Sequence, residues 1–226
     1  MDKTLERRTI RKISWRLLPL IVVIYFVAYI DRTNVSFASF GMTRANDLSV
    51  AGWRRLYQAC GSRAAEVQPK LAGELEAELA LVETEWSHDL PTGVIHADLF
   101  PDNVFFRDRE VSGLIDFYFA CTDFLAYDLA ICLNAWCFEA DGSLNVTKAR
   151  LLLEGYRQAR PLSSAELAAL PLLARGAALR FLLTRLFDWL NQPAGALVRP
   201  KDPLEYLRKL RFHRGVTNIA GYGLDA

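Results

Sequence analysis

Apolar and polar positions alternate along most of the chain at spacings that predict several helices and a few short strands. One helix is predicted where apolar residues follow steps of three and four: Leu71, Leu75, Leu79, Val82 and Trp86. β-Branched or aromatic runs predict strands at 94–96, 104–106 and 111–117. Helical spacing returns in four segments, 123–138, 147–159, 164–191 and 203–213. This order predicts an α+β fold that is mainly helical, with a small β-sheet.

The N-terminal segment has a different pattern. The uncharged run Leu17–Ile30 has 14 residues, fewer than the roughly 20 that cross a bilayer as a helix. Residues 1–16 hold six basic side chains against two acidic ones, which favours a membrane-associated helix with its N-terminus in the cytoplasm. A signal peptide is disfavoured, because Asp31–Asn34 interrupts the run where a small-residue cleavage site would stand. We therefore expect possible membrane contact through residues 17–40.

Composition places the rest of the chain among soluble globular proteins. Of 226 residues, 52% are hydrophobic and 23% are charged, close to the average for such domains. The net charge of +1 offers no general attraction to nucleic acid, so nucleic acid is not an expected partner. The four cysteines form no CxxC pair and there are three histidines, so no zinc spacing can be assembled. Reduced, buried thiols in a cytoplasmic domain are the simplest interpretation of the cysteines.

One segment carries a spacing that points to chemistry. Within VIHADLFPDNVFF, His96, Asp98 and Asn103 follow the pattern H-x-D-x-x-x-x-N of kinase catalytic loops. Asp98 would accept the proton of a substrate hydroxyl, and Asn103 would bind a magnesium ion on the nucleotide phosphates. Asp116 ends the apolar run GLIDF, where a kinase places its second metal ligand. The pattern predicts a catalytic site that uses ATP and Mg²⁺.

Each of these residues also has a structural interpretation. Asp98 and Asn103, taken singly, are common turn residues beside a proline such as Pro101. The combination with His96 and a later Asp at a strand end favours the catalytic interpretation. His96 belongs to the catalytic motif but is better explained as a support of the loop. Asp128, in AYDLA, either anchors the following helix or contacts substrate.

Longer runs of the sequence around this motif resemble one family. The runs GVIHADLFPDNVFF, GLIDFYFACTDFLAYDLAICLNAWCFE and RGAALRFLLTRLFDWLN resemble homoserine kinases of the aminoglycoside phosphotransferase-like group, over about 46–226. The resemblance implies the C-terminal lobe of a protein-kinase-like fold in the cytoplasm, whose small sheet carries the catalytic loop. It also implies transfer of the ATP γ-phosphate to the hydroxyl of L-homoserine, in threonine biosynthesis. Charged candidates for contact with this small substrate are Asp123, Asp128, Arg180, Arg185 and Asp188.

A second resemblance covers the N-terminus. The segment LLPLIVVIYFVAYIDRTNVSFASFGM resembles the first transmembrane helix of a major facilitator transporter. The two resemblances predict a fusion, with a separate hydrophobic helix over 1–42, a junction at 43–48 and a kinase-like lobe over 49–226.

Among the charged candidates, Arg180 and Arg185 keep an alternative interpretation as solvated or helix-capping charges, since a step of five places them on different helix faces.

Two kinase features are not found in the sequence. No G-x-G-x-x-G run occurs, and none of the six lysines lies on a predicted strand before Asp98, although a kinase needs both groups to hold the phosphates. We therefore expect the small N-terminal lobe to be missing and the chain to be inactive alone. Two alternatives to a phosphotransferase stay open: a membrane-tethered pseudokinase or binding module, and a transporter fragment with an incidental C-terminal part.

Overall fold

The computed structural model describes residues 48–86, 89–108, 110–192 and 200–224, which belong to one compact unit, Leu48–Ala226. The predicted transporter-like helix over 1–42, and most of the junction at 43–48, lie outside the described residues. Six α-helices are described: α2 (Val50–Cys60), α3 (Leu71–Glu85), α4 (Leu125–Trp136), α5 (Val146–Ala159), α6 (Ser164–Leu190) and α7 (Pro203–Arg214). Four short strands are described: β1 (Thr92–Ile95), β2 (Val104–Arg107), β3 (Glu110–Leu114) and β4 (Cys121–Phe124).

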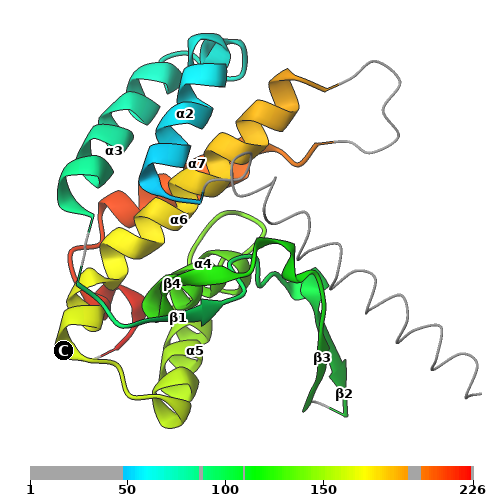
Figure 1. The fold of residues 1–226 in the computed structure, drawn as a ribbon, viewed down its shortest axis with the longest axis vertical. Coiled ribbons are helices and arrows are strands. Elements are labelled where there is room, and N and C mark those ends of the chain that lie inside the picture. The colour runs from blue at the N-terminus through cyan, green and yellow to red at the C-terminus, as the bar shows by residue number, and fades with distance from the viewer. Residues whose placement is uncertain (1–47, 87–88, 109, 193–199, 225–226) are drawn as a thin grey trace, which may run out of the picture. The chain divides into compact units, whose positions relative to one another are not determined.

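Helix α6 is the central element of the helical part, and α4 and α7 both pack against it (Figure 1). It begins at a capping box, in which the side chains of Ser163 and Glu166 each accept a hydrogen bond from the other's backbone N–H. Helices α2 and α3 lie side by side and also contact α6 (Figure 1). With 27 residues, α6 is long and apolar enough to cross a membrane, but 67% of its most apolar window is buried in the protein. It is therefore explained as a core helix.

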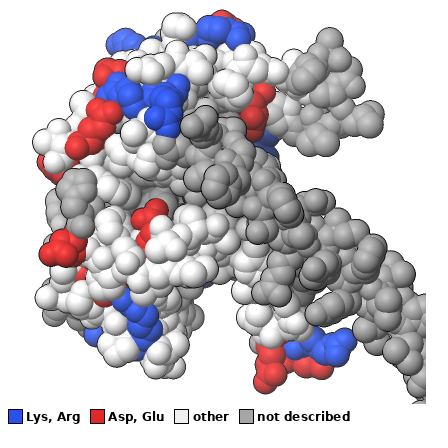
Figure 2. Space-filling model, viewed as in Figure 1, with Lys and Arg blue, Asp and Glu red and all other residues white. Residues whose placement is uncertain are grey.

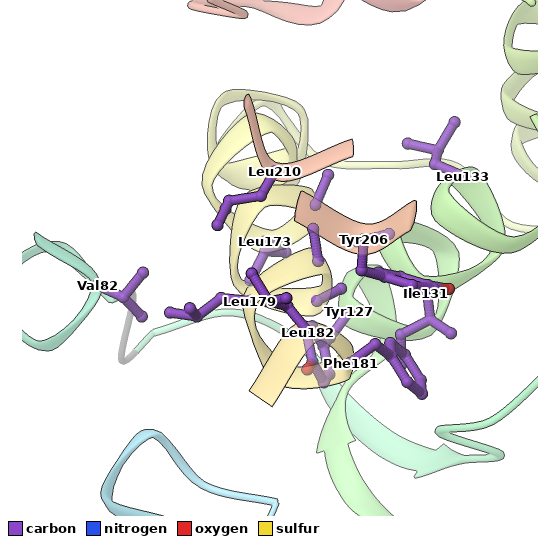
Figure 3. Close-up of a cluster of buried hydrophobic side chains, with 14 of the residues drawn as sticks. Val82, Tyr127, Ile131, Leu133, Leu173, Leu179, Phe181, Leu182, Tyr206 and Leu210 are labelled. Carbon is purple, nitrogen blue, oxygen red and sulfur yellow. The ribbon is translucent and has the colours of Figure 1, made fainter. Parts of the chain in front are cut away.

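All six described helices contribute side chains to the core, and Figure 3 shows the part where α4, α6 and α7 meet. Tyr127 and Ile131 of α4 meet Leu179 and Leu182 of α6, and Tyr206 of α7 closes the cluster. All five side chains are fully buried. Burial of each such side chain contributes about 1.5–3 kcal/mol, so this cluster holds α4, α6 and α7 together.

The strands form two separate antiparallel pairs, not the one small sheet that the sequence predicts. β1 pairs with β4, with Gly93 opposite Asp123, and β2 pairs with β3. The β2–β3 hairpin extends away from the helices (Figure 1), and its tip is polar, with exposed Arg107, Asp108 and Glu110.

Most helix predictions are confirmed within a few residues, and one is wrong at its start. The segment 123–138 is predicted to be helical throughout, but Asp123 and Phe124 belong to β4, and α4 begins at Leu125. The error has a physical reason: pairing with β1 extends the backbone before the helix can begin. Helix α2 is absent from the sequence predictions. Its N-cap is Ser49, whose side chain accepts a hydrogen bond from the backbone N–H of Gly52.

Candidate active site

The loop after β1 makes a sharp turn at Ala97, between the motif residues His96 and Asp98. Ala97 has φ +60°, in the left-handed region that costs a residue with a Cβ about 1–2 kcal/mol. Such strained backbone persists only where surrounding contacts hold it, and it is frequent at functional sites. The contacts that hold Ala97 therefore show how the site is built.

Two side chains of opposite charge, the half-buried Asp128 and the buried Arg180, hold the Ala97 peptide groups. The Asp128 carboxylate of α4 accepts hydrogen bonds from the backbone N–H of Ala97 at 2.9 Å and of His96 at 3.1 Å. The guanidinium of Arg180, on α6, donates from Nη1 to the Ala97 carbonyl oxygen at 2.7 Å. Asp128 thus anchors the catalytic loop and not, as one sequence interpretation held, the helix that contains it.

Asn103 folds back onto Asp98, as the kinase-loop pattern predicts. Its Nδ2 group donates to the Asp98 carbonyl oxygen at 2.8 Å and lies 3.5 Å from the Asp98 carboxylate oxygen Oδ2. With Nδ2 used in this way, the Asn103 amide oxygen is left to bind a cation. Trp136 supports the same turn, because its indole N–H donates to the Leu99 carbonyl oxygen at 2.8 Å.

His96 joins the loop to the strand that delivers Asp116. Its Nε2 lies 2.9 Å from the carbonyl oxygen of Ile115, and the Ile115 N–H donates to the Asn103 carbonyl oxygen at 3.1 Å. Asp116 follows at φ +60° and is exposed. His96 itself is buried. These contacts support the interpretation of His96 as a structural group that sets the Asp116 backbone beside the loop.

Burial raises the pKa of the Asp98 carboxyl group, with a smaller contribution from the negative charge of Asp116. The positive charges of Arg180 and Lys201 oppose this increase. A raised pKa suits a carboxylate that accepts a proton near neutral pH. A metal ion shared by Asp98, Asp116 and Asn103 stays a prediction.

The other charged candidates take different positions. Asp123, on β4, accepts a hydrogen bond from the backbone N–H of Phe124 at 2.7 Å, and burial raises the pKa of its carboxyl group. Arg185 is buried and donates to Glu205 at 2.6 Å and to the Asp202 carbonyl oxygen at 3.2 Å, which ties α6 to the start of α7. Asp188 is exposed on the last turns of α6. Substrate contact by any of them stays a prediction.

Among the described residues, no group of three or more His, Cys, Asp or Glu side chains is arranged to hold a metal ion. The candidate magnesium ligands are of another kind, two carboxylates and one amide. Oxygen ligands of this kind match the preference of Mg²⁺, which binds few protein groups and keeps several ligands from substrate and water. The donor set of Asp98, Asn103 and Asp116 therefore fits this ion.

The surface around these strands is largely apolar. Figure 2 shows Lys, Arg, Asp and Glu side chains over α2 and α3 and at the tip of the β2–β3 hairpin. Over α2 and α3, Arg54 pairs with Glu76 at 2.7 Å and with Glu83 at 2.6 Å. Exposed apolar side chains instead follow the strands and the turn after β3: Val94, Phe105, Phe106, Val111, Leu114, Ile115, Phe117 and Tyr118. Asp116 stands within this apolar surface.

Two features of the loop were not predicted from the sequence: the left-handed conformation of Ala97 and the hydrogen bond from Trp136. The strain at Ala97 has no signal in the residue itself, since alanine does not favour positive φ. In the sequence, Trp136 looks like an ordinary apolar residue of a helix. Its hydrogen bond to the Leu99 carbonyl oxygen spans 37 positions, so no local pattern predicts it. Both depend on tertiary contacts.

Comparison with known proteins points to one family. The phosphotransferase enzyme family matches residues 24–162, more than half of the chain. "Homoserine kinase" of Xanthobacter autotrophicus is 69% identical over 84% of this chain and 59% of its own length, and that of Rhodospirillum rubrum is 65% identical over 86% and 60%. "Homoserine kinase" of Afipia carboxidovorans is 67% identical over 85% of this chain and 59% of its own length.

The chain spans about 60% of the length of these relatives. The family match begins at residue 24, within the segment 1–42 that resembles a transporter helix, and that second resemblance gains no support from these matches. The family match spans the loop from His96 to Asn103 and Asp116. The chain therefore belongs to the phosphotransferase enzyme family.

Proposed function

We propose that the chain carries the catalytic and metal-binding groups of an ATP-dependent kinase whose phosphoryl acceptor is the hydroxyl group of L-homoserine. The observation that carries this proposal is the loop from His96 to Asn103, in which the left-handed turn at Ala97 and the contact between Asn103 and Asp98 are both present. The substrate rests on the relatives, which share 64–69% of the aligned residues with this chain and are named homoserine kinase.

In this proposal each residue of the site, in the loop or beside it, has one task. Asp98 accepts the proton of the homoserine hydroxyl as that oxygen attacks the γ-phosphorus of ATP, and ADP leaves. Asn103 and Asp116 would hold Mg²⁺, which would neutralise charge on the phosphate oxygens when bound. Asp128 and Arg180 hold the backbone of the loop, while His96 sets the distance between the loop and Asp116. The lobe is the C-terminal lobe of a kinase-like fold.

The acceptor must also be recognised as an amino acid. Its ammonium group calls for a carboxylate, and Asp123, Asp128 and Asp188 were the candidates in the sequence. Asp123 is supported over Asp128 for this task, because both carboxylate oxygens of Asp128 already accept hydrogen bonds from the loop backbone. Asp123 lies on the strand beside β1, whose end delivers the loop.

The test is homoserine-dependent release of ADP. It is measured on the natural chain and on a chimera in which residues 1–45 are replaced by the small lobe of a related kinase, each with its Asp98→Asn variant. We expect turnover in the chimera, and a decrease of at least about a hundredfold with Asp98→Asn. A folded chimera that binds ATP but phosphorylates choline or an aminoglycoside, and not homoserine, would overturn the substrate. A chimera indifferent to Asp98→Asn would overturn the catalytic role.

A further inference from the structure

Arg180 has a place in the molecule that neither composition nor motif explains. It lies in the middle of α6, and only 4% of its surface is exposed. A buried guanidinium is costly unless hydrogen bonds and neighbouring charges compensate for lost water. Its hydrogen bond to the backbone of the β1–β2 loop joins positions 83 residues apart in sequence. Such a costly group in the core calls for a structural or functional reason.

The surroundings of Arg180 fix the direction of its guanidinium. The central carbon Cζ lies 4.6 Å from the ring centre of Phe181 and 5.5 Å from that of Phe119. Phe181 packs in turn against Phe100, with ring centres 5.0 Å apart. The aromatic rings thus restrict the guanidinium, and their contact with Phe100 extends this packing to the catalytic loop itself.

The bond from Arg180 reaches the peptide group that follows Ala97, and Asp128 binds the peptide group that precedes it. The Ala97 carbonyl oxygen accepts from Arg180 at 2.7 Å, while the Ala97 N–H donates to Asp128 at 2.9 Å. A cation on the carbonyl and an anion on the N–H bind both polar groups of a residue with φ +60°. Relaxation of Ala97 to negative φ would break this arrangement.

We propose that Arg180 is a positioning residue, which holds Ala97 in its left-handed conformation and thereby fixes the direction in which the next residue, Asp98, leaves the loop. Its task is distinct from the contact with a substrate carboxylate that the sequence alone suggested. The inference rests on the proposed function in one respect, the role of Asp98 as the proton acceptor. The conformation of Ala97 can be tested without any turnover.

The primary test is made on the full natural chain with Arg180→Met, which keeps an apolar stem but removes the donor. Solution NMR of alanine-labelled protein reports the Ala97 conformation through its Cα and Cβ shifts, and Ala97→Gly identifies the signal by its loss. We expect the shifts of Ala97 to leave the left-handed range. We also expect amide exchange at Phe100, whose N–H donates to the Asp98 carbonyl oxygen, to accelerate at least about tenfold relative to the natural chain, while exchange in α3 stays unchanged.

The matched control is Arg175→Met, on the same helix. Arg175 pairs with Glu78 at 2.6 Å and has no bond to the loop. This variant should lower thermal stability and leave the Ala97 signals in place. A folded Arg180→Met protein with unchanged Ala97 shifts and unchanged Phe100 exchange would overturn the proposal.

A second variant separates positioning from packing. Ala97→Gly placed on the Arg180→Met background supplies a residue that adopts positive φ without steric cost. If Arg180 acts through Ala97, this double variant should recover at least half of the lost amide protection at Phe100. Should Arg180→Met unfold the chain, recovery of the fold by Ala97→Gly supports the proposal. Failure of Ala97→Gly to recover either protection or fold assigns Arg180 to packing alone and overturns it.

Turnover of the chimera distinguishes positioning from substrate binding. A positioning role predicts that Arg180→Met lowers kcat by at least about tenfold, with KM for homoserine changed less than about threefold. A large increase in KM at unchanged kcat would show that Arg180 binds the substrate, and would overturn the positioning role even while the proposed kinase activity stood.

Discussion

Lowering the pH from 7.5 to 5 should destabilise the protein through one buried histidine. His213, on α7, is fully buried, and burial together with the positive charges of Lys209 and Arg175 lowers the pKa of its imidazole from 6.5 to about 3. In the neutral ring one nitrogen donates and the other accepts. Nε2 lies 3.2 Å from Asn134 Oδ1, which can only accept, so Nδ1 accepts from the Tyr222 hydroxyl at 2.8 Å.

The size of the effect follows from the two pKa values. A pKa that is lower in the folded state than in the unfolded state gives stability that is greatest above pH 6.5 and decreases as the pH falls toward 3. At pH 5 the unfolded chain has bound a proton that the folded chain has not. One pKa unit corresponds to about 1.4 kcal/mol, so His213 alone should lower the free energy of unfolding by roughly 2 kcal/mol at that pH.

Urea denaturation at pH 7.5 and pH 5 measures this loss. His213→Gln removes the titrating ring, so it should be less stable at pH 7.5 but should lose about 2 kcal/mol less than the natural chain on acidification. Tyr222→Phe is the matched control, because it removes a hydrogen bond to the ring and keeps the titration. Equal losses in the natural chain and in His213→Gln would refute the reasoning.

Two further changes test other charged side chains. Glu78 is 3% exposed and pairs with Arg175 and Arg214 at 2.6 Å each, so Glu78→Gln should lower the free energy of unfolding by about 3 kcal/mol; a loss below about 0.5 kcal/mol in urea denaturation contradicts this. Asp128→Asn leaves one of two loop N–H groups without an acceptor, which costs about 1–3 kcal/mol. Amide exchange at Ala97 and His96 should accelerate at least about fivefold, and unchanged exchange contradicts the anchoring role of Asp128.

The local patterns that predict the helices are short in range. Steps of three and four from Leu71 to Val82 correctly predict α3, because one face of a helix must be buried whatever its partner. The same reasoning fails at Asp123, where the segment pairs with β1 across some thirty positions of sequence. Strand pairing depends on a partner that is distant in sequence, so the two pairs could not be separated from one small sheet.

The candidate site divides in a similar way. Asp98 and Asn103 are five positions apart, and their contact follows from a local turn that the motif predicts. The groups that hold the turn come from α4 and α6: Asp128 reaches Ala97 across 31 positions and Arg180 across 83. Sequence alone placed both among substrate candidates, because a charged residue in a helix carries no sign of which backbone it will bind.

The most direct test of the proposed chemistry detects the phosphorylated product by ³¹P NMR. The chimera with a complete small lobe is incubated with Mg²⁺, ATP and L-homoserine, and ³¹P NMR follows formation of a phosphate monoester. We expect one new monoester signal whose appearance requires homoserine, and its loss with Asp98→Asn, because that change removes the proton acceptor held between Ala97 and Asn103. A folded, ATP-binding chimera that forms no homoserine phosphate, or that forms it equally well with Asp98→Asn, would contradict the proposal.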